Sequence, residues 1–255
     1  MTRVLPSVAR LPSAPVERRH APVNGGDHAR AYERFRPCLR WEFSFSCTFC
    51  LLHEAQVCPE GAVGSSQFWI EHLELQSERP DLRSTYTNLV YACRRCNLAR
   101  RSRSRIDALG RRLLDPCSDT WAEHFLSAGD ELLPRTPNAE YTAATYDMND
   151  PVKVALRRDR REAIDESLHV LRTVPILLEQ LMQGIGFRPR PEQRLHLEIA
   201  EQLHKSLAAA RRTLIQLSAV PADASSDCAC YRTVCELPET VLAELLYIEL
   251  EPGRQ

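Results

Sequence analysis

Two Cys-x-x-Cys pairs, Cys47/Cys50 and Cys93/Cys96, carry the strongest chemical signal in this chain. A turn of that spacing lets both sulfur atoms face one ion, and two such pairs supply the four thiolates of a closed tetrahedral Zn²⁺ site. We therefore predict one structural Zn²⁺, whose binding contributes on the order of 10 kcal/mol to folding. The alternative is a set of four buried or redox-active thiols.

The 42 residues between the two pairs are more than a compact zinc ribbon needs, and they contain polar residues suited to hydrolysis. His72 follows Glu71 directly, so at a strand end one side chain can hold a divalent ion while the other faces a water molecule. A neutral histidine with a pKa of about 6.5 can take the proton of that water. Asn97 offers an amide oxygen suited to Mg²⁺ or Mn²⁺, and Asn88 is predicted to hydrogen-bond the His72 ring. A divalent ion next to such a base favours cleavage of a phosphodiester bond.

A basic run follows the second cysteine pair. Between Arg94 and Arg112 the chain has eight arginines and one acid, Asp107. Such a concentrated positive field suits a polyanion, although the chain has only two lysines, so a solvated, arginine-rich helix face is the alternative. The predicted nucleic-acid contacts are Arg94, Arg95, Arg100, Arg101, Arg103 and Arg105.

The order of these motifs resembles that of the HNH endonuclease family. It runs from Glu71-His72 through Asn88-Leu89 to Cys93-Arg-Arg-Cys96-Asn97, with a basic segment behind it. The four cysteines resemble the zinc-stapled branch of that family, which has a ββα-metal core. The resemblance covers about residues 43–125, less than half of the chain.

This resemblance implies roles for single residues. His72 would be the general base, Asn88 would orient it, and Glu71 with Asn97 would bind the catalytic divalent ion. The substrate would be DNA, cut to leave a 5′ phosphate and a 3′ hydroxyl. Many members have Asp where Glu71 stands and His where Asn97 stands; both differences favour Mg²⁺ or Mn²⁺ over a catalytic Zn²⁺. Lys is frequent in the family where this chain has Arg100.

The pattern of apolar residues predicts the elements that position these groups. Strands are predicted over 43–47, 67–72, 88–93 and 141–146, and a surface loop over 77–84. A helix is predicted from Asn97 to about Leu109, ended by Gly110. Leu113–Cys117 and Trp121–Phe125 are expected to pack back on this domain.

The last hundred residues favour helices. Asp150-Pro151 is typical of a helix start, and Pro175 is predicted to kink or end that helix. A second helix with one apolar stripe begins near Pro191, so we expect a helical hairpin. A linker over 221–227 and a short helix over 238–248 complete the prediction.

The fold class is therefore predicted as α+β, with a small zinc-stapled ββα-metal, treble-clef-like domain followed by a mostly α-helical C-terminal region. The expected organisation is a flexible arm (1–29), a nuclease domain (30–128), a connector (129–149) and the helical region (150–255). Hydrophobic residues make up 44% of the chain and the net charge is −1, so an ordinary folded core is expected. No apolar run approaches the roughly 20 residues of a membrane span and no secretion segment is recognisable, so we expect a cytoplasmic protein without membrane contact.

The remaining cysteines carry weaker signals. Cys38, Cys58 and Cys117 lack a Cys-x-x-Cys partner and are expected to be core or surface thiols. The third cluster, Cys228, Cys230 and Cys235, has three ligands and no evident fourth. A simple structural role is favoured there over a second metal.

Together these features predict a metal-dependent DNA endonuclease or nickase, with structural Zn²⁺ and catalytic Mg²⁺ or Mn²⁺. RNA is not excluded as substrate. The alternatives are a non-catalytic zinc module that binds nucleic acid or protein, and a nuclease effector of a defence or toxin system that needs a partner. The C-terminal helices offer a surface for a protein partner or for a homo-oligomer.

Overall fold

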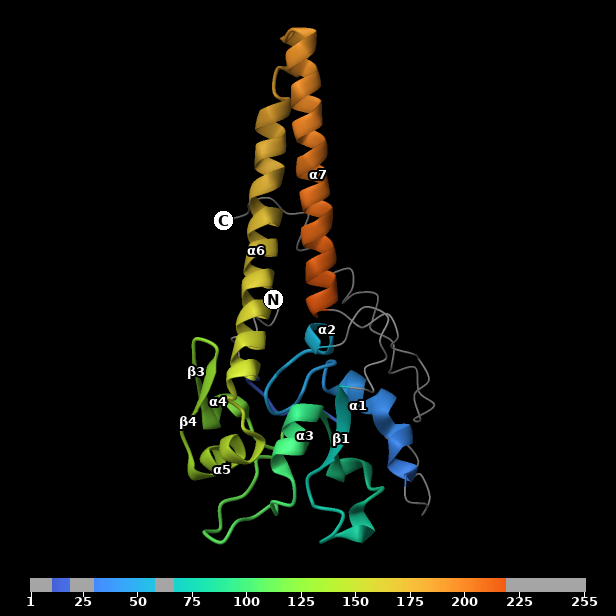
Figure 1. The fold of residues 1–255 in the computed structure, drawn as a ribbon, viewed down its shortest axis with the longest axis vertical. Helices are drawn as coiled ribbons and strands as arrows, with labels where there is room; N and C mark the ends of the chain where they lie inside the picture. The colour runs from blue at the N-terminus through green and yellow to red at the C-terminus, as the bar shows by residue number, and fades with distance from the viewer. Residues whose placement is uncertain (1–10, 19–29, 58–66, 219–255) are drawn as a thin grey trace. The chain divides into compact units, whose positions relative to one another are not determined.

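The computed structural model of the chain describes residues 11–18, 30–57 and 67–218. These residues form an α+β protein of short helices and small antiparallel sheets, followed by two long helices (Figure 1). The described residues up to Asp159 belong to a first compact unit, and a second unit begins at Arg160. The candidate site lies entirely in the first unit.

The first unit contains most of the elements of the structure. In chain order they are η1 (Ala31–Phe35), α1 (Arg36–Glu42), α2 (Glu54–Val57), β1 (Phe68–His72), η3 (Pro80–Leu82), η4 (Tyr86–Asn88), β2 (Leu89–Cys93), α3 (Arg94–Arg100), α4 (Trp121–His124), β3 (Phe125–Ala128), β4 (Glu131–Pro134) and α5 (Pro137–Tyr146).

The hairpin of β1 and β2 is the framework of this unit. The strands are antiparallel, with Phe68 opposite Cys93 at one end and His72 opposite Leu89 at the other. Both strands were predicted from the sequence and are confirmed, since each is short, apolar and almost entirely buried. Helix α3 follows β2 directly, so the second cysteine pair lies where strand turns into helix.

The core of the unit draws on segments far apart in the chain. Phe49, between the first two cysteines, stacks on Tyr146 of α5 with ring centroids 3.5 Å apart. Trp121 is buried and donates its indole N–H to the carbonyl oxygen of Thr48 at 3.1 Å. Leu113 and Phe125 are buried in the same core, as the sequence predicts.

The predicted strand over 43–47 is not formed. Helix α1 ends at Glu42, and Ser44 and Phe45 then take φ angles of 50° and 55°. Left-handed backbone cannot extend into a strand, so only Ser46 makes an isolated bridge, with His53.

The helix predicted over 97–109 has different bounds. Helix α3 begins at Arg94 and ends at Arg100, because Arg101 adopts a φ of 54° that stops the helix. The chain then forms a tight turn closed by a bridge between Ile106 and Arg112. Gly110, with a φ of 76°, serves that turn and does not cap a helix.

The strand predicted over 141–146 is wrong, because these residues belong to α5. The hydroxyl of Thr136 accepts a hydrogen bond from the Ala139 amide at 3.3 Å, and Pro137 begins the helix. These are ordinary helix-start signals. The β3–β4 hairpin, which turns at Gly129, was not predicted. Residues expected to form a connector thus pack into the first unit.

Two long helices follow, α6 (Pro151–Met182) and α7 (Arg190–Ser218), joined through η5 (Ile185–Phe187). Asp150 caps α6, since its carboxylate accepts from the Val152 amide at 3.0 Å, as predicted. Helix α6 does not end at Pro175 but continues to Met182. Within the second unit, α6 and α7 run side by side as the expected hairpin (Figure 1), and Arg160 donates to the Leu217 carbonyl at 2.9 Å.

Several predictions fall outside the described residues: the linker over 221–227, the helix over 238–248, Cys58, Cys228, Cys230, Cys235 and most of the arm over 1–29. The part of the arm over 11–18 is packed on the first unit, where Arg18 forms a salt bridge with Glu42 at 2.9 Å. None of the helices in the described residues combines the length and the apolar composition that a membrane crossing requires.

Candidate functional site

The four predicted zinc ligands form one cluster. The sulfur atoms of Cys47, Cys50, Cys93 and Cys96 all lie within 4.8 Å of one another, and all four residues are buried. The Cys50 and Cys93 sulfurs are 3.6 Å apart, whereas a disulfide bond measures about 2.05 Å. Tetrahedral zinc with bonds of about 2.3 Å needs sulfur separations of roughly 3.8 Å. The cluster can therefore hold a metal ion such as zinc.

Local backbone geometry places each pair of sulfurs. The Leu51 amide donates to the Cys47 carbonyl at 2.9 Å, and Leu51 has a φ of 63°, so the first pair sits in a tight knuckle. In the second pair, Cys93 caps α3, and its sulfur accepts from the Cys96 amide at 3.4 Å. A helix N-terminus favours a negatively charged group, so this position suits a thiolate.

Burial and hydrogen bonds among the thiols shift the pKa values of three of the cysteines, and not all in the same direction. Burial raises the pKa values of Cys50 and Cys96, and hydrogen bonds with Cys47 and Cys93 raise both of them further. Burial also opposes ionisation of Cys47, but hydrogen bonds from the other three thiols lower its pKa well below the ordinary value. The thiolate of Cys47 is therefore favoured, and a bound cation would favour ionisation of Cys50 and Cys96 as well.

The carboxylate of Glu71 is buried and has a partner on each oxygen. Its Oε1 accepts from Arg100 at 2.5 Å and lies 3.4 Å from the Tyr146 hydroxyl, while its Oε2 accepts from the Asn97 amide group at 2.6 Å. Burial raises the pKa of Glu71, and the positive charge of Arg100 opposes that shift. Glu71 and Asn97 are thus brought together as predicted.

The ring of His72 is held from both sides. Its Nε2 lies 2.9 Å from the Arg83 carbonyl oxygen, which can only accept, so Nε2 carries the proton. Its Nδ1 is therefore the free base, and the Gln76 amide group donates to it at 3.2 Å. Burial lowers the pKa of His72 despite the hydrogen bond to Arg83, and the charge of Arg100 lowers it further. A neutral imidazole with a basic Nδ1 results.

Asn88 does not contact the imidazole ring, which corrects the prediction that it hydrogen-bonds His72. Its side chain accepts from the Glu74 amide at 2.7 Å and donates to the carbonyls of Glu74 and Leu82 at 3.2 and 3.3 Å. Asn88 therefore holds the loop between β1 and β2. Because that loop also supplies the Arg83 carbonyl, Asn88 positions His72 indirectly.

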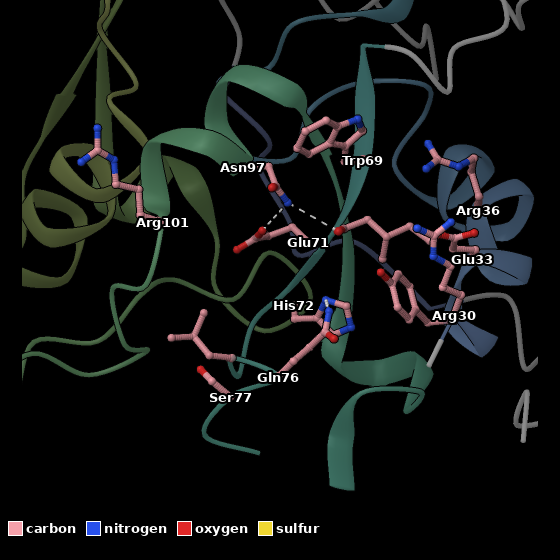
Figure 2. Close-up of a pocket in the computed structure, with 13 residues that line it drawn as sticks. Arg30, Glu33, Arg36, Trp69, Glu71, His72, Gln76, Ser77, Asn97 and Arg101 are labelled. Atoms are coloured by element: carbon pink, nitrogen blue, oxygen red, sulfur yellow. Dashed lines mark hydrogen bonds and ion pairs between the residues drawn. The ribbon is translucent and has the colours of Figure 1, made fainter. Parts of the chain in front are cut away.

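A pocket of about 690 Å³ brings the three central residues together. Glu71 and His72 are neighbours on a strand and point to opposite faces, as predicted. Both nevertheless line this pocket, and the edge of β1 away from β2 is covered by side chains, since Arg36 donates to the Phe68 carbonyl and Arg100 to the His72 carbonyl. Figure 2 shows Asn97 reaching Glu71 above His72, with the Arg30–Arg36 segment across the pocket.

The basic run divides into buried and exposed members. Arg100 is only 1% exposed and donates to Glu71 and to the carbonyls of His72 and Leu73, so its predicted contact with nucleic acid is wrong. Arg105 forms salt bridges with Glu74 and Asp115, and Arg103 donates to two carbonyls at the end of α5. The exposed members are Arg94, Arg95, Arg101 and Arg103, of which Arg101 lines the pocket.

Part of the pocket wall was not predicted from the sequence. Arg30, Tyr32 and Arg36 line it from η1 and α1, and Gln76 lines it from the loop. The Tyr32 ring meets the His72 ring edge-on at 4.8 Å. No spacing in the sequence connects these residues with Glu71 and His72, because only the packing of α1 against the sheet brings them near.

No family model, no curated protein and no solved structure matches this chain. The functional assignment therefore depends on the geometry of the site.

Proposed function

We propose that this protein is a metal-dependent endonuclease of the HNH type that hydrolyses phosphodiester bonds in DNA. Strands β1 and β2, helix α3 and the four-cysteine cluster would then form a zinc-stapled ββα-metal, treble-clef-like core. The observation that supports this most directly is the state of His72. Its Nε2–H is bound by the Arg83 carbonyl, its Nδ1 is left as the basic nitrogen, and the residue lines a pocket shared with Glu71 and Asn97.

Glu71 and Asn97 are suited to hold the catalytic ion. An amide group can rotate to exchange its nitrogen and oxygen at little cost. With the Asn97 oxygen turned inward, it and Oε2 of Glu71 would offer two hard ligands to Mg²⁺ or Mn²⁺. The ion would supply Lewis-acid stabilisation of the phosphate.

His72 would do the proton transfer. Its Nδ1 would take a proton from the attacking water while the Arg83 carbonyl keeps the ring in place and stabilises the imidazolium that forms. Gln76 occupies the position next to Nδ1 in the structure, so its amide marks where that water would sit.

The pocket has cationic side chains for the phosphate backbone. Arg101 lies on one side and Arg30 and Arg36 on the other, while Arg94 and Arg95 are exposed on α3. Arginine binds phosphate oxygens in bidentate geometry. These five residues are our candidates for nucleic-acid contacts.

One observation favours the alternative of a non-catalytic zinc module. The buried Arg100–Glu71 salt bridge is also consistent with a purely structural contact, because each of the two charges is paired with the other inside the protein. Such a module would bind nucleic acid or protein through the exposed arginines and would cleave nothing.

Nicking of supercoiled plasmid with Mg²⁺ or Mn²⁺ tests the proposal, with single-stranded DNA and RNA as further substrates. We expect His72→Ala to lower the rate about 10²- to 10⁴-fold, while the variant keeps its zinc and a cooperative melting transition. His196→Ala, on α7, is the matched control and should cut normally. A His72→Ala protein as fast as the parent would disprove the proposed base. If the parent protein binds DNA but fails to cut it with every divalent ion tested, the non-catalytic module is favoured.

A further inference from the structure

Two buried cations lie in the first turns of α6. Lys153 and Arg157 are 2% and 1% exposed, and their spacing of four residues places them on one face of the helix. Both are exceptional positions, since lysine and arginine are almost never fully buried unless they are paired. Neither was identified from the sequence as a functional residue.

Every hydrogen-bond partner of these two cations is neutral. The Lys153 ammonium donates to the carbonyls of Tyr146 and Asp147 at 2.7 and 2.8 Å. The Arg157 guanidinium donates to backbone carbonyls, among them that of Cys50 at 3.2 Å, and to the Asn149 side chain at 3.1 Å. Within the described ranges, no salt bridge with a carboxylate involves either side chain. The hydrogen bonds of both groups are therefore satisfied, but neither positive charge is paired directly with a carboxylate.

Unbalanced buried charge is costly. Moving one ion out of water costs several kcal/mol in a real protein, even after relaxation, and two like charges on adjacent turns of a helix also repel each other. A negatively charged group is thus expected close by. The four buried thiols interact with Lys153, and Cys50 and Cys96 interact with Arg157, which Asp130 and Glu131 also influence.

The contacts tie both cations to the cysteine cluster. Arg157 binds the carbonyl of Cys50, which is itself a predicted ligand. Lys153 binds the carbonyl of Tyr146, whose ring stacks on Phe49 between the first two cysteines. Burial alone would lower the pKa of Lys153, yet interaction with all four cysteines raises it, which is consistent with a short distance to the cluster.

We propose that Lys153 and Arg157 are the counter-ions of a divalent metal held by Cys47, Cys50, Cys93 and Cys96. A divalent ion with four thiolates carries two net negative charges, and the two side chains balance them. Metal binding therefore does more than staple the β1–β2 hairpin, because it also fixes the start of α6 to the first unit. This inference does not depend on nuclease activity.

A purely structural role makes a different prediction. Both cations bind carbonyls near the C-terminal end of α5, where positive charge is favourable. If that were their whole function, they would stabilise the metal-free and the metal-loaded protein equally. Counter-ions instead stabilise the protein mainly when the thiolates are formed.

Zinc affinity, measured by competition with a chromogenic chelator, tests the proposal on the full chain. We expect Lys153→Met and Arg157→Met each to weaken zinc binding about 10- to 100-fold, the usual effect of losing a partner of the ligand shell. The chain offers matched controls, because Lys205 is its only other lysine and is exposed beside Glu201, and Arg158 is the neighbouring, half-exposed arginine. Lys205→Met and Arg158→Met should bind zinc like the parent.

Two further measurements separate charge from shape. Arg157→Lys keeps the charge, so it should bind zinc more tightly than Arg157→Met. The rise in melting temperature on adding zinc should shrink in the two Met variants, while the chelated proteins change little. For a variant that folds only with metal, Co²⁺ added during refolding reports thiolate coordination through its sulfur-to-metal absorption band.

Three results would overturn the proposal. One is zinc or Co²⁺ affinity in Lys153→Met and Arg157→Met equal to that of the controls. Another is an equal loss of affinity in Arg157→Lys and Arg157→Met. The third is an equal drop in melting temperature with and without zinc.

Discussion

The two ends of the β1–β2 hairpin carry candidate metal sites of opposite character. At the Cys93 end, four identical ligands are sealed from solvent and leave no free coordination position. At the His72 end, a carboxylate, an amide and an imidazole line a pocket of about 690 Å³. A closed tetrahedral site stabilises a fold, whereas an open one leaves room for water and substrate. Under the proposed function, one short hairpin would separate the stabilising ion from the chemistry.

The sites also differ in how their charge is balanced. The cysteine cluster has two buried cations nearby, and both remain available to offset the charge that metal binding creates. Glu71 forms a buried salt bridge with Arg100. A cation entering the pocket therefore meets a carboxylate whose charge is largely neutralised. We expect it to bind weakly and exchange readily, unlike the zinc.

The largest expected effect comes from breaking the closed site. Cys93→Ser removes one thiolate and the cap of α3. The variant should therefore lose the contribution of zinc binding to the folding free energy, which is on the order of 10 kcal/mol. Loss of stoichiometric zinc and of the cooperative melting transition should follow together. Cys117→Ser, which changes a partly exposed thiol outside the cluster, is the control. A folded, zinc-loaded Cys93→Ser protein would contradict the claim that all four cysteines bind a zinc ion that stabilises the fold.

The next effect contrasts two adjacent arginines. Arg100→Met leaves Glu71 buried without its counter-ion, and should destabilise the protein by about 3–5 kcal/mol in urea unfolding. Arg101→Met removes an exposed charge from the pocket rim, so stability should change by less than about 0.5 kcal/mol. The DNA affinity of Arg101→Met should fall, and the magnitude of the slope of log affinity against log salt concentration should decrease by about 1. Equal stabilities of the two variants would contradict the buried role of Arg100.

The smallest effect concerns pH at the open site. Burial lowers the pKa of His72 below its usual value of about 6.5, so nicking should decline only when the pH falls below about 6.5, through the lowered pKa. The same shift affects stability. The unfolded state takes up the proton first as the pH falls, so the contribution of a neutral His72 is complete above about pH 6.5 and is lost as the pH drops through its folded-state pKa. An NMR titration of the ring checks both effects, and a pKa above 6.5 would contradict them.

Short-range patterns predicted what depends on neighbouring residues. The Cys-x-x-Cys spacing, the apolar strands β1 and β2 and the Asp150-Pro151 helix start are local features, and the structure contains all of them. The errors arose where backbone geometry overrides composition. The left-handed Arg101 ends α3 within the basic run, and the helix-start signal at Thr136-Pro137 outweighs the strand-like residues of α5.

The sequence by itself determined the chemical types at this site: four thiols in two pairs, and a Glu, a His and two Asn between and beside them. Tertiary structure alone decided their partners. Adjacent Arg100 and Arg101 have the same side chain, but one is buried against Glu71 and the other lines the pocket. Likewise Arg157 meets Cys50 across 107 positions of sequence. Burial and charge pairing depend on contacts between distant elements, and no local pattern contains that information.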